Sequence, residues 1–361
     1  MFNAQKIAAA SPLVMDELLS CCAEAESAAD RYEAEAREAV RRLIAPAGKV
    51  DPKLLEREQF AAHGFAWIAT YVAAIRQMRR WAEANADGEL EQLILQVALG
   101  EYLAQLQGGI AISQVEIVRP ADLGADPMAL DTPAVRKLVA ANTSAARLRI
   151  AELITDGLDS GNFGALGLGD EAMEEVRRQF RRFVDTEVGP HAHGWHMRDE
   201  LIPLPVVQQM ADLGVFGLTV PEEWGGLGMG KLAMCVVTEE LSRGYIGVGS
   251  LGTRSEIAAE LIRAGGTEDQ KKRYLSRIAS GEILPTAVFT EPNTGSDLAS
   301  LRTRAVLEGD TYKINGNKTW ITHAARADIM TLLARSDASK PGYQGLSMFL
   351  AEKPRGDESD P

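Results

Sequence analysis

Apolar residues recur at helical spacing along most of the chain, and short apolar runs separated by turn residues take over near its end. Alanine and glutamate dominate residues 15–44, and Pro46 and Gly48 interrupt the pattern. This composition favours a helix there, within a helical stretch that starts at residue 1. A second helix is predicted to begin at Asp51, because a capping aspartate followed by Pro52 is typical of helix starts.

The helical spacing continues to about residue 158. It runs along the second helix to Met78 and predicts further helices over 90–118 and 134–158, with a Pro/Asp/Gly connection over 119–133. Consecutive amphipathic helices with short connections predict an antiparallel helical bundle over 1–160. Its aromatic side chains are expected to pack in the core rather than line a ligand pocket.

A second helical region follows a linker. Four glycines fall within residues 159–169, which is typical of a linker. The region 170–283 then shows amphipathic spacing again, with Pro190 expected to end its first helix. Helices are predicted over 171–188, 203–213, 232–243, 254–264 and 269–280.

The pattern changes to strands after Ile283. Turn signals at 308–310 and 315–316 separate short apolar runs. These runs predict strands over 303–307, 311–314, 318–322, 329–334 and 346–351. The fold class is therefore α+β: a helical extension (1–160), an all-helical domain (170–283), and an incomplete, barrel-like antiparallel β domain (284–361).

Composition narrows the possible partners. The chain has 361 residues and a net charge of −13, which argues against a nucleic-acid partner or an anionic membrane. No run approaches the ~18 apolar residues of a membrane span, and no export signal is evident. The three cysteines have no zinc-site spacing, so a reducing cytoplasm is the expected location.

Two polar segments are the candidates for chemistry. Residues 289–297 (FTEPNTGSD) follow an apolar run, and their turn can direct backbone N–H groups and the Thr290 and Ser296 hydroxyls toward one ligand. No lysine follows the glycine, so a nucleoside-triphosphate loop is excluded. On the predicted strand 318–322, Trp320 and Thr322 would share one face and Ile321 the other. Taken singly, an ordinary turn and a core tryptophan remain open alternatives.

Residues 170–361 resemble the acyl-CoA dehydrogenase family through five segments in the same order. These are residues 220–226 (VPEEWGG), 239–242 (EELS), 266–270 (GTEDQ), 290–297 (TEPNTGSD) and 315–322 (NGNKTWIT). The resemblance implies bound FAD, α,β-dehydrogenation of an acyl-CoA thioester, and electron transfer to electron-transfer flavoprotein. It also implies a homodimer or homotetramer for the full-length protein.

The resemblance carries site residues with it. Thr290 would hydrogen-bond the pyrimidine side of the flavin, Trp320 would flank the ring, and Thr322 would reach N5. Ser296 would lie near the pyrophosphate and also approach the acyl-CoA. The cofactor-binding residues implied are Val288, Phe289, Thr290, Gly295, Ser296, Trp320, Ile321 and Thr322.

Two residues depart from the family pattern near the expected site. His323 replaces a commoner asparagine, and either substrate choice or a supporting hydrogen bond would explain it. Arg254 starts a predicted helix near the acyl pocket, where it could pair with a second substrate carboxylate; a surface ion pair with Glu256 is the alternative. The clustered histidines at 191, 193 and 196 are expected to join two helices rather than bind a metal.

The helical extension is similar to that of the methylsuccinyl-CoA dehydrogenase subfamily, which implies conversion of (2S)-methylsuccinyl-CoA to mesaconyl-CoA. The family's glutamate base lies in a further helical domain, so it is expected beyond Pro361 and no catalytic residue is assigned within this chain. Glu291 is expected to satisfy local backbone groups instead. Another acyl-CoA specificity, an oxidase or monooxygenase, and a non-catalytic assembly module remain alternatives.

Overall fold

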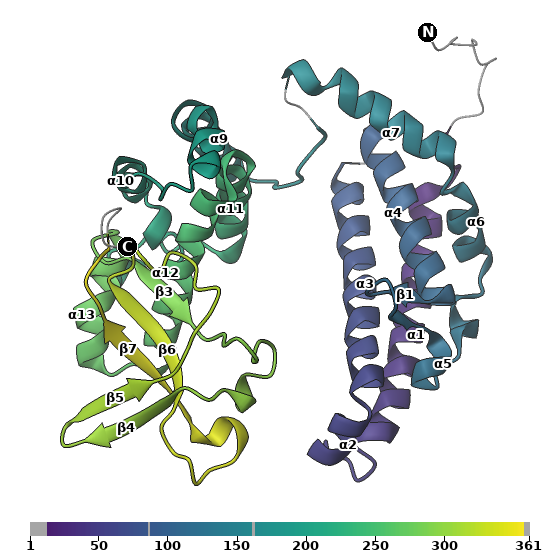
Figure 1. Ribbon diagram of the computed structural model, residues 1–361. Coiled ribbons are helices and arrows are strands. Elements are labelled where there is room, and N and C mark those ends of the chain that lie inside the picture. The colour runs from purple at the N-terminus through teal and green to yellow at the C-terminus, as the bar shows by residue number, and fades with distance from the viewer. Residues whose placement is uncertain (1–12, 86, 161–162, 357–361) are drawn as a thin grey trace. The chain divides into compact units, whose positions relative to one another are not determined.

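The computed structural model describes residues 13–85, 87–160 and 163–356. The chain forms two compact units, Met1–Gly167 and Leu168–Pro361 (Figure 1). Residues 1–12, where the first helical stretch was expected to begin, lie outside the described residues. In the described ranges, no helix has both the length and the apolarity needed to cross a bilayer.

The first unit is a helical bundle, as predicted. Asp51 caps α2 by accepting hydrogen bonds from the N–H groups of Lys53 and Leu54. The helix predicted over 90–118 ends ten residues early, because Gly109 takes a left-handed φ of 129° and a short hairpin follows. The elements of this unit are α1 (Leu18–Ile44), α2 (Pro52–Arg57), α3 (Gln59–Ala84), α4 (Glu89–Gly108), β1 (Ile110–Ala111), β2 (Ile117–Val118), α5 (Pro120–Leu123), α6 (Pro133–Ala141) and α7 (Ser144–Asp156).

Small side chains let the helices of the bundle approach closely. The buried face of α1 is rich in alanine. On α4, a Cβ at Gly100 would lie 2.6 Å from the carbonyl oxygen of Leu138 on α6. The aromatic rings of Trp67, Tyr71 and Tyr102 meet edge to face and pack, partly buried, against the same core. The expected core role of these aromatic residues is confirmed.

The predicted linker is fastened to the first unit. The indole N–H of Trp81 donates to the carbonyl of Ala165 at 2.9 Å, and the N–H of Ala165 donates to the carboxylate of Glu91 at 2.7 Å. Gly167 and Gly169 then take left-handed φ values of 68° and 64°. Only glycine adopts this conformation without strain, which explains its repeated use at the junction.

The second unit begins with helices packed on one another. The prediction that Pro190 ends the first helix is wrong. Residues Val184–Val188 form a π-helical turn that leads directly into the next helix. This bulge packs against Gly244, where a Cβ would lie 2.4 Å from Val184 Cγ1. The helices are α8 (Glu171–Phe183), α9 (Gly189–Met197), α10 (Leu204–Asp212), α11 (Lys231–Gly244), α12 (Ile246–Gly265) and α13 (Glu268–Ala279).

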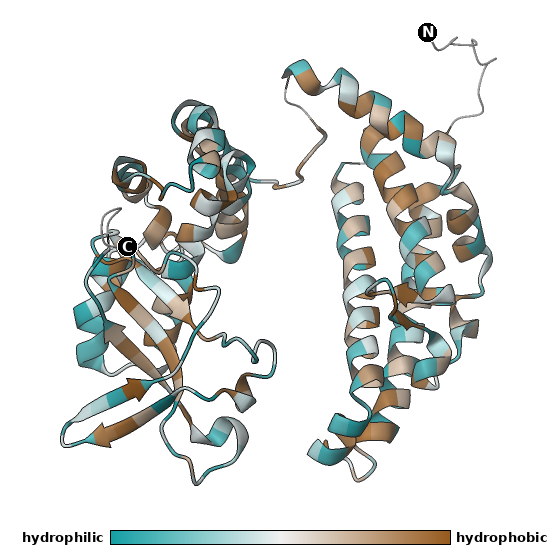
Figure 2. Cartoon of the chain, in the orientation of Figure 1, coloured by the Kyte–Doolittle hydropathy of each residue, from teal (hydrophilic) through white to brown (hydrophobic). Residues whose placement is uncertain are grey.

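The sheet of the second unit is mixed rather than purely antiparallel. Its strands are β3 (Pro285–Val288), β4 (Arg304–Glu308), β5 (Thr311–Asn315), β6 (Ile329–Arg335) and β7 (Leu346–Glu352). The β4–β5 and β6–β7 pairs are antiparallel as predicted, whereas β6 runs parallel to β3 and, at one residue pair, to β4. The central strand β6 is apolar and largely buried, whereas β5 is polar and exposed (Figure 2).

Candidate functional site

The first candidate segment, residues 288–297, leaves the sheet at the end of β3. Val288 is buried beside Leu332 of β6, its register partner. The chain then makes a tight turn in which the N–H of Glu291 donates to Thr294 O (2.9 Å) and the N–H of Thr294 to Glu291 O (3.0 Å). This turn leaves the following Gly295 exposed to solvent.

The Glu291 carboxylate is buried in this turn and organises it. It accepts hydrogen bonds from the backbone N–H groups of Arg302 (2.7 Å) and Thr303 (2.8 Å) and from Lys318 Nζ (3.0 Å). Burial opposes ionisation, but contacts with Thr303, Arg302 and Lys318 outweigh it and lower the pKa of Glu291 to about 2. The expectation that Glu291 satisfies local backbone groups is confirmed.

The second candidate segment, residues 316–323, is not the strand that was predicted. The N–H of Thr319 donates to the carbonyl of Thr290 at 3.0 Å, which places this segment beside the first. Trp320 has a left-handed φ of 58° and is 89% exposed, so Trp320 and Thr322 do not share a strand face. Ile321 packs instead against the small sheet core that contains Val288.

Arg254 of α12 reaches the second segment. Its Nη2 donates to the Thr322 hydroxyl at 3.1 Å, and the Thr322 carbonyl accepts from the Thr286 hydroxyl at 2.5 Å. Glu256, the alternative partner of Arg254, forms an ion pair with Lys231 instead. Within the described ranges no acidic side chain pairs with Arg254, and its buried Nε has no hydrogen-bond partner. Burial lowers the pKa of this guanidinium.

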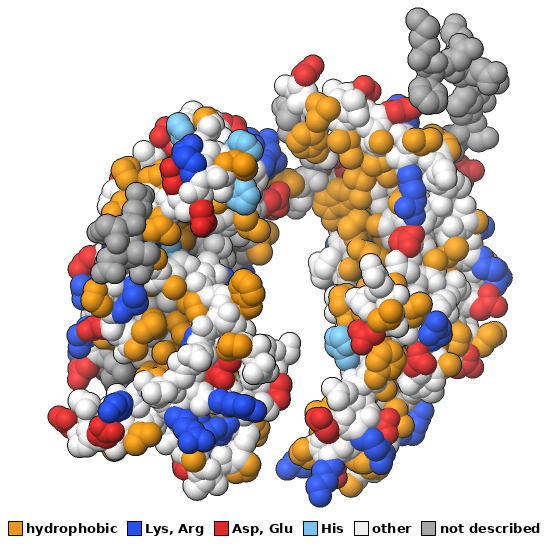
Figure 3. Space-filling model, in the orientation of Figure 1, with side chains coloured by type: hydrophobic (Ala, Val, Ile, Leu, Met, Phe, Trp, Pro, Cys, Tyr) orange, Lys and Arg blue, Asp and Glu red, His pale blue; other side chains and the backbone are white. Residues whose placement is uncertain are grey.

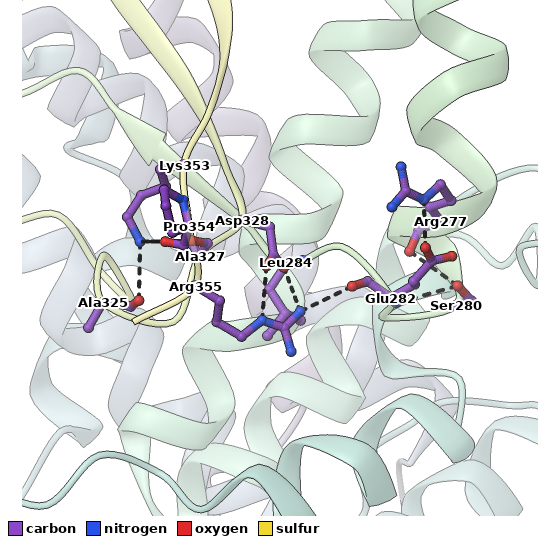
Figure 4. A network of polar contacts seen from close by, with 10 residues as sticks. All are labelled: Arg277, Ser280, Glu282, Leu284, Ala325, Ala327, Asp328, Lys353, Pro354 and Arg355. Atoms are coloured by element: carbon purple, nitrogen blue, oxygen red, sulfur yellow. Dashed lines mark hydrogen bonds and ion pairs between the residues drawn. The ribbon is translucent and has the colours of Figure 1, made fainter. Parts of the chain in front are cut away.

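The turn after Thr322 is held by the end of β7 and the residues beyond it (Figure 4). Lys353 Nζ donates to the carbonyls of Ala325 (3.2 Å) and Ala327 (3.0 Å). Arg355 forms an ion pair with Asp328 at 2.5 Å. These contacts fix the backbone of residues 325–328, which follow the second segment.

His323 lies at the start of this turn with a left-handed φ of 65°. Its Nε2 is buried and has no hydrogen-bond partner in the described part of the chain. Burial, reinforced by the positive charges of Arg326 and Arg355, lowers the pKa of His323 to about 4. The imidazole is therefore neutral at pH 7, and the alternatives of a substrate contact and a supporting hydrogen bond stay open.

A groove of about 620 Å³ borders both segments. Its lining includes three basic side chains, Arg302, Arg304 and Lys313. Two carboxylates also line the groove: Glu291 pairs with Lys318, and Glu308 lies 4.0 Å from Lys313. Neither arginine side chain is ion-paired within the described residues. Lys and Arg side chains also gather beside the β4–β5 hairpin in Figure 3. A groove of this charge suits phosphate groups, despite the acidic net charge of the chain.

Lys318 is the functional candidate that the motif analysis did not single out, although it lies inside one of the quoted motifs. The sequence signal that could have identified it is an acidic residue, Glu291, in one polar motif and a lysine in the next.

The described residues contain no group of three or more His, Cys, Asp or Glu side chains that could hold a metal, and His191 stacks on Trp195.

Two family models match the second unit. The model for the acyl-CoA dehydrogenase N-terminal domain matches residues 170–282, and the model for the middle domain matches residues 286–358. The two ranges together span about half of the chain. They include all five sequence segments on which the resemblance was based.

Individual proteins show the same similarity. A (2S)-methylsuccinyl-CoA dehydrogenase of Cereibacter sphaeroides is 58% identical over 353 residues, which is 96% of this chain and 64% of that protein. A short-chain-specific acyl-CoA dehydrogenase of Clostridium acetobutylicum is 40% identical over 50% of this chain and 47% of its own length. The crystal structure of an acyl-CoA dehydrogenase from Geobacillus kaustophilus is 33% identical, with a TM-score of 0.49 over 51% of this chain and 48% of that one.

The chain thus spans less than two thirds of the first of these relatives and about half of the others. The predicted order of a helical extension, a helical domain and a β domain agrees with the two family matches and with the structure. The chain belongs to the acyl-CoA dehydrogenase family.

Proposed function

We propose that this protein is an FAD-dependent dehydrogenase that converts (2S)-methylsuccinyl-CoA to mesaconyl-CoA. The observation that carries the proposal is the 58% identity to a (2S)-methylsuccinyl-CoA dehydrogenase across 96% of the chain. That similarity includes most of the helical extension, which lies outside the residues matched by the two family models. A general acyl-CoA dehydrogenase of another specificity would not require a shared extension.

The geometry of the two segments fits a flavin. The Thr319–Thr290 hydrogen bond brings them together, and Trp320 presents an almost fully exposed aromatic ring that a planar ligand can cover. FAD, when bound, would supply the electron-accepting chemistry. The residues that would hold it are Val288, Phe289, Thr290, Gly295, Ser296, Trp320, Ile321 and Thr322.

Arg254 supports a substrate that carries a second carboxylate. A half-buried guanidinium with an unpartnered Nε and no ion pair to any described residue retains hydrogen-bonding capacity for an anion. Arginine binds carboxylates through two parallel hydrogen bonds, so a dicarboxylic acyl group matches it chemically. Ser296 and His323 are the other proposed substrate contacts.

Glu291 is unsuited to removing the substrate proton. Its carboxylate already accepts two backbone N–H groups and the Lys318 ammonium, and its pKa of about 2 makes it a weak base. We therefore propose that the base is a glutamate outside residues 1–361. The role of the described residues is to bind and orient the cofactor and the substrate.

The proposed setting follows from the same similarity. We propose that the electrons pass to electron-transfer flavoprotein and that the full-length protein is a homodimer or homotetramer in the cytoplasm. The free state of Cys21, Cys22 and Cys235 is compatible with a reducing compartment. The proposed domains are 1–160, 170–283 and 284–361.

Anaerobic titration of the purified full-length protein tests the proposal. We expect a flavin absorption band that bleaches on addition of (2S)-methylsuccinyl-CoA but not of butyryl-CoA. Bleaching by butyryl-CoA alone would refute the substrate assignment and leave the cofactor assignment intact. A protein that neither contains nor binds FAD would refute both.

A further inference from the structure

Lys318 connects the two segments of the site through its side chain. It is one of the less exposed lysines, with 9% of its side chain accessible. Its Nζ donates to the carbonyl of Phe289 at 2.8 Å and to the Glu291 carboxylate at 3.0 Å. One ammonium group thus contacts both the end of β3 and the turn that follows it.

Few other polar contacts hold the second segment against the first. The predicted strand over 318–322 is absent, so no ladder of backbone hydrogen bonds fixes the register there. The other hydrogen bonds described between this segment and β3 or its turn run from Thr319 N–H to Thr290 O at 3.0 Å and from the Thr286 hydroxyl to Thr322 O at 2.5 Å. The position of this segment therefore depends more on the Lys318 contacts than it would if the segment were paired in a sheet.

The charge on Lys318 is well matched by its surroundings. A buried ammonium is costly unless opposite charge and hydrogen-bond acceptors surround it. Here it has both, because Glu291 is ionised and the Phe289 carbonyl accepts a second hydrogen bond. Removing the ammonium would leave the Phe289 carbonyl without this donor and Glu291 with only its backbone donors.

We propose that Lys318 is a positioning residue that sets the spacing between residues 288–290 and Trp320–Ile321–Thr322, and through it the fit of the flavin. The inference rests on the proposed function, because the spacing matters only if both segments contact one ligand. Displacements of ~1 Å at a binding site can change rates on the order of 100-fold.

Two lysine variants test the proposal in the full-length protein. Lys318→Met keeps most of the length of the side chain and removes its charge. Lys340→Met makes the same change before β7, at an exposed lysine that pairs with Asp337 at 3.5 Å and does not line the groove. We expect Lys318→Met to raise the Kd for FAD at least about tenfold, to alter the visible circular dichroism of bound flavin, and to speed amide exchange at Thr319. We expect Lys340→Met to change none of these.

A double variant, Lys318→Met with Glu291→Gln, removes both charges and guards against a folding defect caused by an unpaired buried carboxylate. We expect it to recover thermal stability but not FAD affinity. Recovery of both would mean that Lys318 acts through stability alone, and would overturn the proposal. An unchanged Kd and exchange rate in folded Lys318→Met would overturn it as well. A wild-type protein that binds no FAD would instead refute the proposed function, and the inference with it.

Discussion

Replacement of Arg254 by methionine should separate stability from substrate recognition. The guanidinium makes one hydrogen bond in the described structure, to Thr322, and its buried Nε makes none. A fold under selection for stability alone would favour an apolar side chain at this position. We therefore expect Arg254→Met to leave the protein folded and to impair its activity with the dicarboxylic substrate.

The expected sizes follow from the contacts. Losing the hydrogen bond to Thr322 costs about 1 kcal/mol, while removing an unsatisfied buried donor gains about 1–3 kcal/mol. The free energy of unfolding should therefore be unchanged or rise slightly. Truncating one partner of a buried charge pair costs about 2–5 kcal/mol of binding. At ~1.4 kcal/mol for each tenfold change, the KM for methylsuccinyl-CoA should rise at least about 30-fold.

The assay compares two arginine variants with the wild type. Steady-state kinetics with methylsuccinyl-CoA should show the loss in Arg254→Met alone, and chemical denaturation should show that both variants stay folded. Arg263→Met is the matched control, because Arg263 lies on the same helix and pairs with Glu260 at 3.1 Å on the surface. An Arg254→Met enzyme with an unchanged KM for methylsuccinyl-CoA would refute the carboxylate contact, and marked destabilisation would refute the energetic reasoning.

Three further predictions concern packing, exposure and pH. In α4, Gly100→Ala should lower the free energy of unfolding by about 1–3 kcal/mol because its Cβ would meet the Leu138 carbonyl, whereas Gly108→Ala, with open space around it, should not; equal melting temperatures would refute the close α4–α6 approach. Trp320→Ala should change stability by less than about 0.5 kcal/mol yet weaken FAD binding in equilibrium titrations, and unchanged affinity would remove Trp320 from the flavin site. Because the folded-state pKa of Glu291 is about 2, below its ordinary 4.5, its stabilising effect is present above pH 4.5 and is lost as the pH falls toward 2. The stability difference between wild type and Glu291→Gln should shrink over that range in chemical denaturation, and a constant difference would contradict the assignment.

Long-range periodicity made the helices predictable. The predicted starts and ends of α11 and α13, and the predicted end of α1, agree with the structure to within about three residues, because each has an amphipathic pattern with recognisable ends. At Pro190 the residue type indicated an interruption, but the π-helical turn that absorbs it depends on packing against Gly244. That packing partner is sixty residues away in the chain, beyond any local signal.

The candidate site shows a similar division. That Glu291 binds backbone N–H groups could be predicted from its place in a polar turn, although the donors, Arg302 and Thr303, lie 11 and 12 residues further along the chain. The prediction of a strand over 318–322 was wrong, although polar and apolar residues alternate there and the residue types favour strands. Lys318 and Thr319 tie that segment to residues 289–291, just after β3, and these tertiary contacts override local propensity. The partner of Arg254 could not be predicted from the sequence either, because Glu256 forms an ion pair with Lys231 on a different helix.

Unfavourable local features concentrate where the two segments meet, and this clustering is itself an argument for function. Two of the non-glycine residues with positive φ, Trp320 and His323, lie in the second segment, and the side chain of Trp320 is also exposed. Orphaned buried nitrogens belong to His323, the residue after Thr322, and to Arg254, which donates to the Thr322 hydroxyl. Each such feature costs of order 1–3 kcal/mol, and an ordinary β-turn would avoid all of them. Since they occur together in one segment of otherwise well-packed structure, a bound ligand that covers the ring and accepts from the guanidinium accounts for them better than folding requirements do.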